Sequence, residues 1–271
     1  MAKKERLDKL LVDRKLVETR EKAKRYIMAN LVLVDNQKVN KAGARCNIES
    51  KLVIERDENQ YVSRGGLKLE KALNEFGISV KDMVVIDVGA STGGFTDCLL
   101  KHGAKKVFCI DVGYGQLDWN LRNDDRVVNM EKTNIRYLSE NDFDVKFDLA
   151  TVDVSFISLL KVLPVIEKLL NEEGKVIALI KPQFEAGREN VKKGGIVNNP
   201  AIHKKIIDNL ISEMKDYFNF IDLTFSPIKN SPGNIEFLLY LTKNQNNVFY
   251  NDKKLIDSKV NEAHKYFEKN N

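Results

Sequence analysis

Residues 86–100, IDVGASTGGFTDCLL, decide the fold of this chain. They continue an apolar run that starts at Met83, and they contain a strand end at Asp87, a glycine-rich turn and the start of a helix. A buried strand that passes through such a turn into a helix is typical of a doubly wound α/β sheet, in which ligands bind at the carboxyl ends of the strands. The segment therefore predicts both the fold class and the edge of the sheet that carries the site.

Similar apolar runs recur along the chain, separated by stretches of helical character. They occupy residues 105–113, 125–130, 147–154 and 175–182. Strands that alternate with helices at this spacing indicate a mostly parallel sheet that is covered on both faces. Two later runs, 218–227 and 234–242, have only a short connection and predict an antiparallel edge, which is similar to the class I, Rossmann-like methyltransferase fold.

The glycine turn is spaced for S-adenosylmethionine and not for a dinucleotide. Its glycines follow the pattern GxxxGG instead of GxGxxG, and Asp87 stands before the first of them. That carboxylate would repel a pyrophosphate, whereas it would attract the ammonium group of the methionine end. Asp111 ends the next strand, where an acid typically takes the ribose hydroxyls of an adenosine. We expect the cofactor to contact Asp87, Gly89, Ser91, Thr92, Gly93, Gly94, Phe95, Asp111, Asn134 and Asp153.

Four ionisable residues are candidates for the reaction itself. Three stand at the ends of expected strands and one precedes the first strand: Asp153, Lys181, Glu236 and Lys68. Asp153 and Lys181 interrupt apolar strands, where an unpaired charge would be costly. The (N/D)PP(Y/F) sequence of many base N-methyltransferases is absent, because the corresponding position reads DVSF. No cysteine follows the fourth or fifth strand either, so a ribose oxygen is favoured over a base as methyl acceptor.

The N-terminal part of the chain has a different character. Residues 1–60 hold 15 Lys and Arg against 10 Asp and Glu, whereas the rest of the chain holds 29 of each. Leucines recur at helical spacing over residues 5–16, and Thr19 is a candidate N-cap for a second helix with basic residues off its apolar stripe. A basic module on a neutral body suggests binding of a polyanion. A lysine-rich terminus that only aids solubility is the alternative.

The order of motifs in this module resembles the S4 RNA-binding domain. RLDKLL is followed by a TRxxAxxxI segment and a VxVDxxxVxKxG segment over roughly residues 4–56. Asn30 stands where that domain usually has a glycine after its second helix, and Asn tolerates the left-handed conformation that such a position often needs.

The second part resembles a known enzyme family. Lys68, Asp153, Lys181 and Glu236 are similar to the tetrad of the FtsJ-type ribose 2′-O-methyltransferases. Together with the S4-like module, the ordered motifs YVSRGGLKL, DVGASTGGFTD, DVGYGQL, DVSFISL and IKPQFE resemble the TlyA, or hemolysin A, family over nearly all of residues 4–243. The resemblance implies an S4 domain at 1–57, a linker at 58–63, a methyltransferase domain at 64–243 and a C-terminal tail with a short helix at 244–271.

Roles follow from this resemblance and from the chemistry of a ribose hydroxyl, which is a poor nucleophile near neutral pH. A lysine base helps only when desolvation or a neighbouring ammonium lowers its pKa, so we expect Lys181 to act as the base. Asp153 and Glu236 would orient it, and Lys68 would contribute charge. The substrate implied is a cytidine of ribosomal RNA or of ribosomal subunits, and the expected RNA contacts are Arg6, Arg20, Lys24, Arg25, Arg64 and Lys71.

Three further features limit the function classes. No run of 18 apolar residues exists, three widely spaced cysteines indicate a cytoplasmic protein with free thiols, and no metal-ligand spacing occurs. A membrane-active hemolysin, as the family name implies, is one alternative. A non-catalytic RNA-binding factor in ribosome assembly is another, although the complete tetrad and glycine turn argue against lost activity. Nothing in the sequence indicates an oligomeric state.

Overall fold

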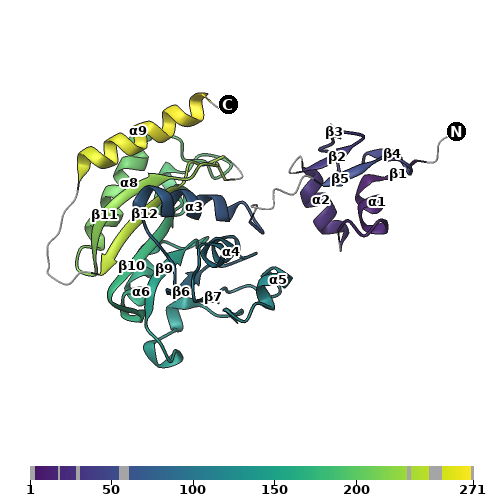
Figure 1. Ribbon diagram of the computed structural model, residues 1–271. Coiled ribbons are helices and arrows are strands. Elements are labelled where there is room, and N and C mark those ends of the chain that lie inside the picture. Colours follow the sequence, from purple (N-terminus) through teal and green to yellow (C-terminus); the bar gives the residue numbers. More distant parts are fainter. Residues whose placement is uncertain are drawn as a thin grey trace. The chain divides into compact units, whose positions relative to one another are not determined.

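The computed structural model describes residues 4–17, 19–28, 31–54, 61–230, 233–243 and 252–269. It divides into two compact units, Met1–Gln60 and Tyr61–Asn271 (Figure 1). The division falls within the expected linker 58–63. Tyr61 and Val62 are the first residues of the second unit and are bonded to its helices: the Tyr61 hydroxyl donates to Glu70 and the Val62 N–H donates to Asp97.

The first unit is a small α+β module. Its elements are β1 (Lys4–Arg6), α1 (Leu7–Asp13), α2 (Arg20–Met28), β2 (Val32–Val34), β3 (Gln37–Lys38), β4 (Arg45–Asn47) and β5 (Leu52–Ile54). The Thr19 hydroxyl accepts the Lys22 N–H, so this residue satisfies a free donor at the start of α2 as the sequence predicts. Leu7, Leu11 and Ile27 are fully buried and join the two helices to the strands in one core.

The second unit is built on a mixed sheet with the strand order β11-β12-β10-β9-β6-β7-β8. Its strands are β6 (Val84–Val88), β7 (Lys106–Ile110), β8 (Val127–Met130), β9 (Phe147–Val152), β10 (Leu170–Ile180), β11 (Phe218–Phe225) and β12 (Phe237–Lys243). Five neighbouring strands of the sheet pair in parallel, in the order β8, β7, β6, β9 and β10. Strand β12 is antiparallel to both of its neighbours, β10 and β11. The chain order along the sheet reverses at β6, next to β9, which is where a doubly wound sheet opens a ligand site.

Helices cover both faces of this sheet. They are α3 (Gly65–Phe76), α4 (Gly94–Lys101), α5 (Trp119–Arg122), α6 (Leu163–Leu169), α7 (Pro182–Glu185), α8 (Pro200–Glu213) and α9 (Lys253–Lys269). Neighbouring residues of a strand point to opposite faces of the sheet. Val85 therefore belongs to the hydrophobic core that the sheet forms with α3 and α4, whereas Ile86 belongs to the core on the other face, with α6 and α8. Helix α9, yellow in Figure 1, contacts α8 and β11 through Ile256, Val260 and Phe267.

Candidate active site

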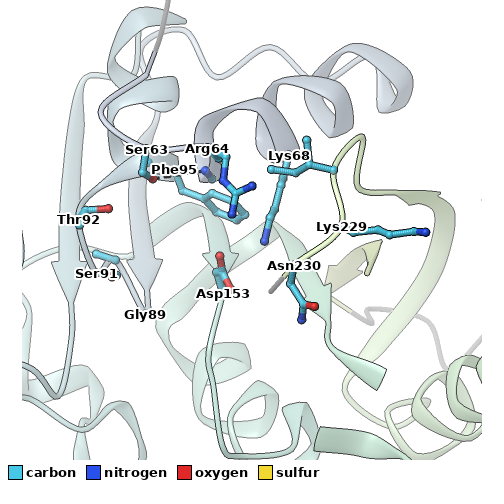
Figure 2. Close-up of a pocket in the computed structure, with 14 residues that line it drawn as sticks. Ser63, Arg64, Lys68, Gly89, Ser91, Thr92, Phe95, Asp153, Lys229 and Asn230 are labelled. Carbon is cyan, nitrogen blue, oxygen red and sulfur yellow. Dashed lines mark hydrogen bonds between the residues drawn. The ribbon is translucent and has the colours of Figure 1, made fainter. Parts of the chain in front are cut away.

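A pocket opens at the carboxyl ends of β6 and β9, where the sheet order reverses. Three segments and one side chain line it: residues 63–68 at the start of α3, residues 89–95 in the turn between β6 and α4, residues 228–230 before β12, and Asp153 after β9 (Figure 2). The expected cofactor residues Gly89, Ser91, Thr92, Gly94 and Phe95 therefore lie around one hollow together with Asp153.

The glycines of this turn are required by the close approach of other chain segments. Gly89 has a φ of +83°, and a Cβ there would clash with the Asp153 carbonyl. Gly93 has a φ of +92°, precedes α4 and would clash with the Leu121 side chain. The left-handed backbone at these two glycines lets the turn pass close to Asp153, and the N–H groups of Gly89 and Ser91 donate to Ile110 and Asp111.

Asp87 is not among the residues that line the pocket, and its direct contact with the cofactor stays a prediction. Its side chain is fully buried, Oδ1 accepts the Thr151 hydroxyl at 2.9 Å and Oδ2 accepts the Thr96 hydroxyl at 2.6 Å. Burial raises the pKa of this carboxyl to about 6, although both threonines oppose the rise. Asp87 thus joins β6, β9 and α4 beneath the glycine turn, since its side chain points inward from the end of the strand.

Asp111 and Asn134 also make local contacts and do not belong to the lining of the pocket. Asp111 Oδ2 accepts the Ser91 N–H at 2.8 Å and Oδ1 accepts the Gly113 N–H at 2.7 Å, so this residue joins the turn after β6 to the loop after β7. Asn134 Oδ1 accepts the Arg136 N–H at 3.1 Å and caps a short 3-10 helix. The position of Asp111 beside Ser91 fits the expected ribose contact, whereas Asn134 is used locally.

The four expected reacting residues form two ion pairs. Lys181 Nζ lies 2.6 Å from Asp153 Oδ1 and donates to Ser155 Oγ at 2.8 Å. Lys68 Nζ lies 2.6 Å from Glu236 Oε2.

Each pair has one member in the pocket and one outside its lining. Lys68 and Asp153 line the pocket, and Figure 2 shows both side chains directed into it. Glu236 is 1% exposed, and the Lys181 side chain is 12% exposed. Charges this buried persist because each has a partner of opposite sign.

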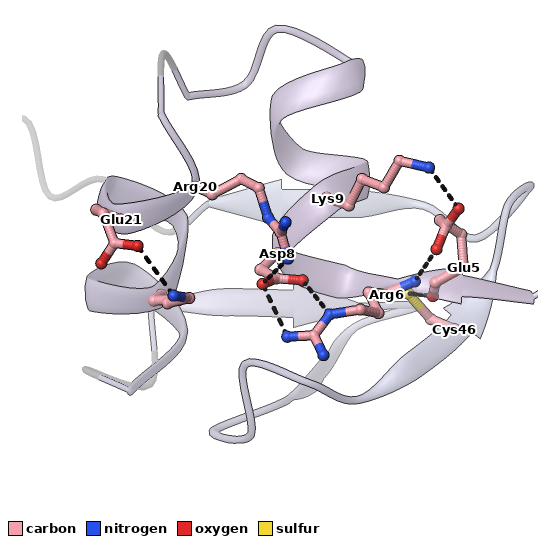
Figure 3. A network of polar contacts seen from close by, with 8 residues as sticks. Glu5, Arg6, Asp8, Lys9, Arg20, Glu21 and Cys46 are labelled. Atoms are coloured by element: carbon pink, nitrogen blue, oxygen red, sulfur yellow. Dashed lines mark hydrogen bonds and ion pairs between the residues drawn. The ribbon is translucent and has the colours of Figure 1, made fainter.

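Two of the four expected RNA contacts of the first unit, Arg6 and Arg20, converge on one buried carboxylate. Arg6 donates twice to Asp8, at 2.9 and 3.0 Å, and Arg20 donates to it at 2.9 Å (Figure 3). Asp8 is fully buried, whereas about half of each arginine side chain is exposed. The two arginines hold the pKa of Asp8 far below its usual range. Lys24 pairs with Glu21 on α2, and the side chain of Arg25 lies outside the described part of the structure.

Arg64 and Lys71, the two expected RNA contacts of the second unit, differ in their surroundings. Arg64 lines the pocket. Lys71 does not face it, because its Nζ lies 3.3 Å from the centre of the Phe225 ring and 3.6 Å from Glu75. Burial lowers the pKa of Lys71. The expectation that Lys71 meets RNA is therefore not supported, since this residue packs against β11 and α9.

Six lining residues were not anticipated from the sequence: Ser63, Gly65, Ala90, Ile228, Lys229 and Asn230. Ser63 immediately precedes the RGGLK segment, so its place beside the glycine turn could have been inferred. Asn230 belongs to NSPGN, which reads as an ordinary turn, and only the pairing of β12 with β10 brings that turn to the site.

Two kinds of feature are absent from the described residues. Among them, no group of three or more His, Cys, Asp and Glu side chains could hold a metal ion. No helix within the same residues is long and apolar enough to cross a membrane.

Comparison with known proteins identifies both parts of the chain. The model of the FtsJ-like methyltransferase family matches residues 61–243, and that of the S4 domain matches residues 5–51. The "Putative rRNA methyltransferase YqxC" of Bacillus subtilis is 53% identical over 89% of this chain and 86% of its own length. The "16S/23S rRNA (cytidine-2'-O)-methyltransferase TlyA" of Mycobacterium tuberculosis is 39% identical over 89% and 91%.

A solved structure supports the same assignment. "Putative hemolysin from Streptococcus thermophilus" superposes with a TM-score of 0.80 at 46% identity, covering 100% of this chain and 99% of the other. Sequence similarity of this extent, a doubly wound sheet and a paired tetrad at its switch point agree with one another. The chain belongs to the FtsJ-like methyltransferase family and carries an S4 domain before its catalytic domain.

Proposed function

We propose that the protein transfers a methyl group from S-adenosylmethionine to the ribose 2′-oxygen of a cytidine in ribosomal RNA. The observation that carries this proposal is the pair of ion pairs, Lys181–Asp153 and Lys68–Glu236, beside a pocket built on a glycine turn. The M. tuberculosis relative, whose printed name specifies rRNA cytidine 2′-O-methylation, supports the substrate. Such a substrate would have this protein act in the cytoplasm.

The residues around the pocket fit S-adenosylmethionine. Gly89 and Gly94 contribute backbone without side chains to the lining of the pocket, and Ser91 and Thr92 add hydroxyl groups. Asp153 supplies a carboxylate to a ligand that carries an ammonium and a sulfonium group. The Asp111 carboxylate accepts the Ser91 N–H beside this turn and is a candidate to bind the ribose hydroxyls of the cofactor. When bound there, the cofactor supplies an electrophilic methyl group.

The chain's own residues would prepare the acceptor oxygen. Lys181 is the proposed base: its side chain is held between Asp153 and Ser155, and in its neutral form the amine can take a proton from a hydroxyl that replaces one of these partners, with Asp153 stabilising the ammonium that forms. Lys68, fixed by Glu236, would hold positive charge near the acceptor oxygen as that oxygen loses its proton. Lys68 lies on α3 and Lys181 directly follows β10, so both side chains are held by regular secondary structure, which favours the close alignment that an in-line displacement requires.

The S4 unit would hold the RNA through Arg6 and Arg20. Half of each side chain is exposed, and Asp8 fixes both guanidinium groups in place. Pre-oriented guanidiniums suit the bidentate contacts that phosphates accept. In the catalytic unit the charged lining residues other than Asp153 are the cations Arg64, Lys68 and Lys229, which would favour the approach of a polyanion.

A transfer assay tests this function directly. Labelled S-adenosylmethionine would be supplied with small ribosomal subunits, large subunits or naked ribosomal RNA, and wild type would be compared with Lys181→Ala. We expect label in RNA with the wild type and a loss of at least two orders of magnitude with the variant. Binding of the cofactor, measured by calorimetry, should persist in the variant. Absence of cofactor binding by the wild type would contradict the proposal, and leakage from liposomes without transfer would support a hemolysin instead.

A further inference from the structure

The segment between β11 and β12 makes contacts that the four reacting residues do not explain. It contributes Ile228, Lys229 and Asn230 to the pocket, and it leads into Glu236 at the start of β12. Glu236 is 1% exposed and has two carboxylate oxygens, of which Lys68 takes only Oε2. A buried carboxylate needs partners on both oxygens to remain charged and fixed in direction. Asn230 supplies the second partner, because its Nδ2 donates to Glu236 Oε1 at 3.1 Å.

The orientation of the Asn230 carboxamide is fixed by the backbone. Its Oδ1 accepts the Asn234 N–H at 2.8 Å and the Gly233 N–H at 3.2 Å. Since two N–H donors point at one end of the amide, that end must be the oxygen, and the NH2 group must face Glu236. Asn230 can therefore act only as a donor toward the carboxylate.

Asn234 anchors this arrangement from the opposite side. It is 1% exposed, its Nδ2 donates to the Gly195 carbonyl at 2.9 Å, and its Oδ1 accepts the Val197 N–H at 2.7 Å. Both ends of its amide are thus bonded to the loop before α8, and its own backbone N–H holds Asn230. A continuous series of hydrogen bonds runs from this loop through Asn234, Asn230 and Glu236 to Lys68.

We propose that Asn230 is a positioning residue for the methyl-transfer reaction, acting through Glu236 to hold the Lys68 ammonium in the pocket. This inference rests on the proposed function. Figure 2 shows Lys68, Asp153 and Asn230 around the same hollow. The geometry assigns Asn230 the task of keeping Glu236 directed at Lys68, so that the ammonium stands where charge changes on the acceptor oxygen. A displacement of about 1 Å at such a site can cost on the order of 100-fold in rate.

Two substitutions separate positioning from a merely structural role. Asn230→Ala removes the donor, and we expect the single-turnover rate at saturating cofactor and RNA to fall on the order of 10- to 100-fold. Asn230→Asp has the same shape and keeps an oxygen for the two backbone donors. The new carboxyl group can donate a hydrogen bond to Glu236 only when it is protonated. When it is ionised, it repels the Glu236 carboxylate. The charged lining groups around this position are Arg64, Lys68, Asp153 and Lys229.

The pH dependence of Asn230→Asp is the decisive readout. We expect its rate to approach that of wild type near pH 5.5 and to fall by at least tenfold relative to wild type by pH 8. The melting temperature of Asn230→Asp should also fall further below that of wild type as the pH rises. The melting measurement needs neither cofactor nor RNA. Asn209→Asp, at an exposed position on α8, is the matched control and should follow wild type in both measurements.

The outcomes distinguish this inference from the proposed function. Wild type that transfers no methyl group would contradict the function itself, whereas an active wild type allows the inference to be judged. An Asn230→Ala rate within twofold of wild type would overturn the inference. The inference would also be overturned if the rate of Asn230→Asp relative to wild type, and its difference in melting temperature from wild type, were the same at pH 5.5 and pH 8. If Asn230→Ala fails to fold, the isosteric variant still decides.

Discussion

The buried ion pair between Lys68 and Glu236 should be visible in the stability of the protein as well as in its activity. Glu236 is 1% exposed and the Lys68 side chain is 12% exposed, so neither charge is well hydrated when its partner is removed. Lys68→Met keeps the length and the apolar stem of the lysine but leaves the carboxylate without its cation. Breaking a buried pair on one side costs about 3–5 kcal/mol, and the opening of Lys68 to the pocket favours the lower end, about 3 kcal/mol.

That free energy corresponds to a fall in melting temperature of roughly 6–12 °C for a unit of this size. The assay is urea unfolding of the full chain, followed by far-ultraviolet circular dichroism. Adding Glu236→Gln to Lys68→Met removes the unpaired charge and retains an acceptor for Asn230. The double variant should therefore recover about 1–3 kcal/mol relative to the sum of the single effects.

A second pair serves as the control. Lys204 and Asp257 lie 3.0 Å apart, but their side chains are 30% and 59% exposed. Lys204→Met should change the free energy of unfolding by about 1 kcal/mol or less, because exposed pairs contribute little. A Lys68→Met variant no more destabilised than Lys204→Met would show that the buried pair contributes no more than an exposed one. Simple addition of the Lys68→Met and Glu236→Gln effects would show that the two residues are not coupled.

Three further predictions concern other buried polar groups. Thr151→Val removes a hydrogen-bond donor to Asp87 and should lower the free energy of unfolding by about 1–3 kcal/mol. The loss should be larger at pH 8 than at pH 5, because burial raises the Asp87 pKa to about 6 and the ionised carboxylate depends more on that donor. Equal losses in urea unfolding at both pH values would contradict this. Burial lowers the pKa of His203 to about 4, so the unfolded chain binds a proton that the folded chain does not between pH 6.5 and 4. Stability should fall by up to about 3 kcal/mol as the pH drops through this window, and His203→Gln should flatten the slope in a series of urea midpoints. Asp8→Ala releases two arginines and should weaken binding of ribosomal RNA in a filter assay, although it removes a negative charge; unchanged or tighter binding would show that Asp8 does not orient them.

The sequence predicted the architecture well because the signals that define it are local. Apolar runs of strand length, alternating with helical stretches, are sufficient to indicate a mostly parallel sheet, and the close connection of the last two runs indicated the antiparallel edge that β11 and β12 form. The glycine turn was recognisable for the same reason. Its spacing and the acid before it lie within 15 consecutive residues, and the structure brings six of the expected cofactor residues to one pocket.

What could not be predicted depends on the direction of single side chains. Asp87 stands near the end of a strand, and the sequence does not show that its carboxylate is directed at Thr96 and Thr151. Lys68 and Lys71 lie on the same helix, yet of the two only Lys68 reaches the pocket, because Lys71 packs over Phe225, which comes 154 residues later in the chain. Such contacts depend on tertiary pairing and leave no local trace in the sequence.

The central claim is that the acceptor is a ribose oxygen and that the tetrad acts on it. The most direct test is to digest methylated ribosomal RNA to nucleosides and to identify the product by mass spectrometry, for wild type and for Lys181→Ala. We expect 2′-O-methylcytidine with wild type and none above background with the variant, while both proteins bind S-adenosylmethionine with similar affinity. Methyl groups found on a cytosine base, or undiminished 2′-O-methylation by Lys181→Ala, would contradict it.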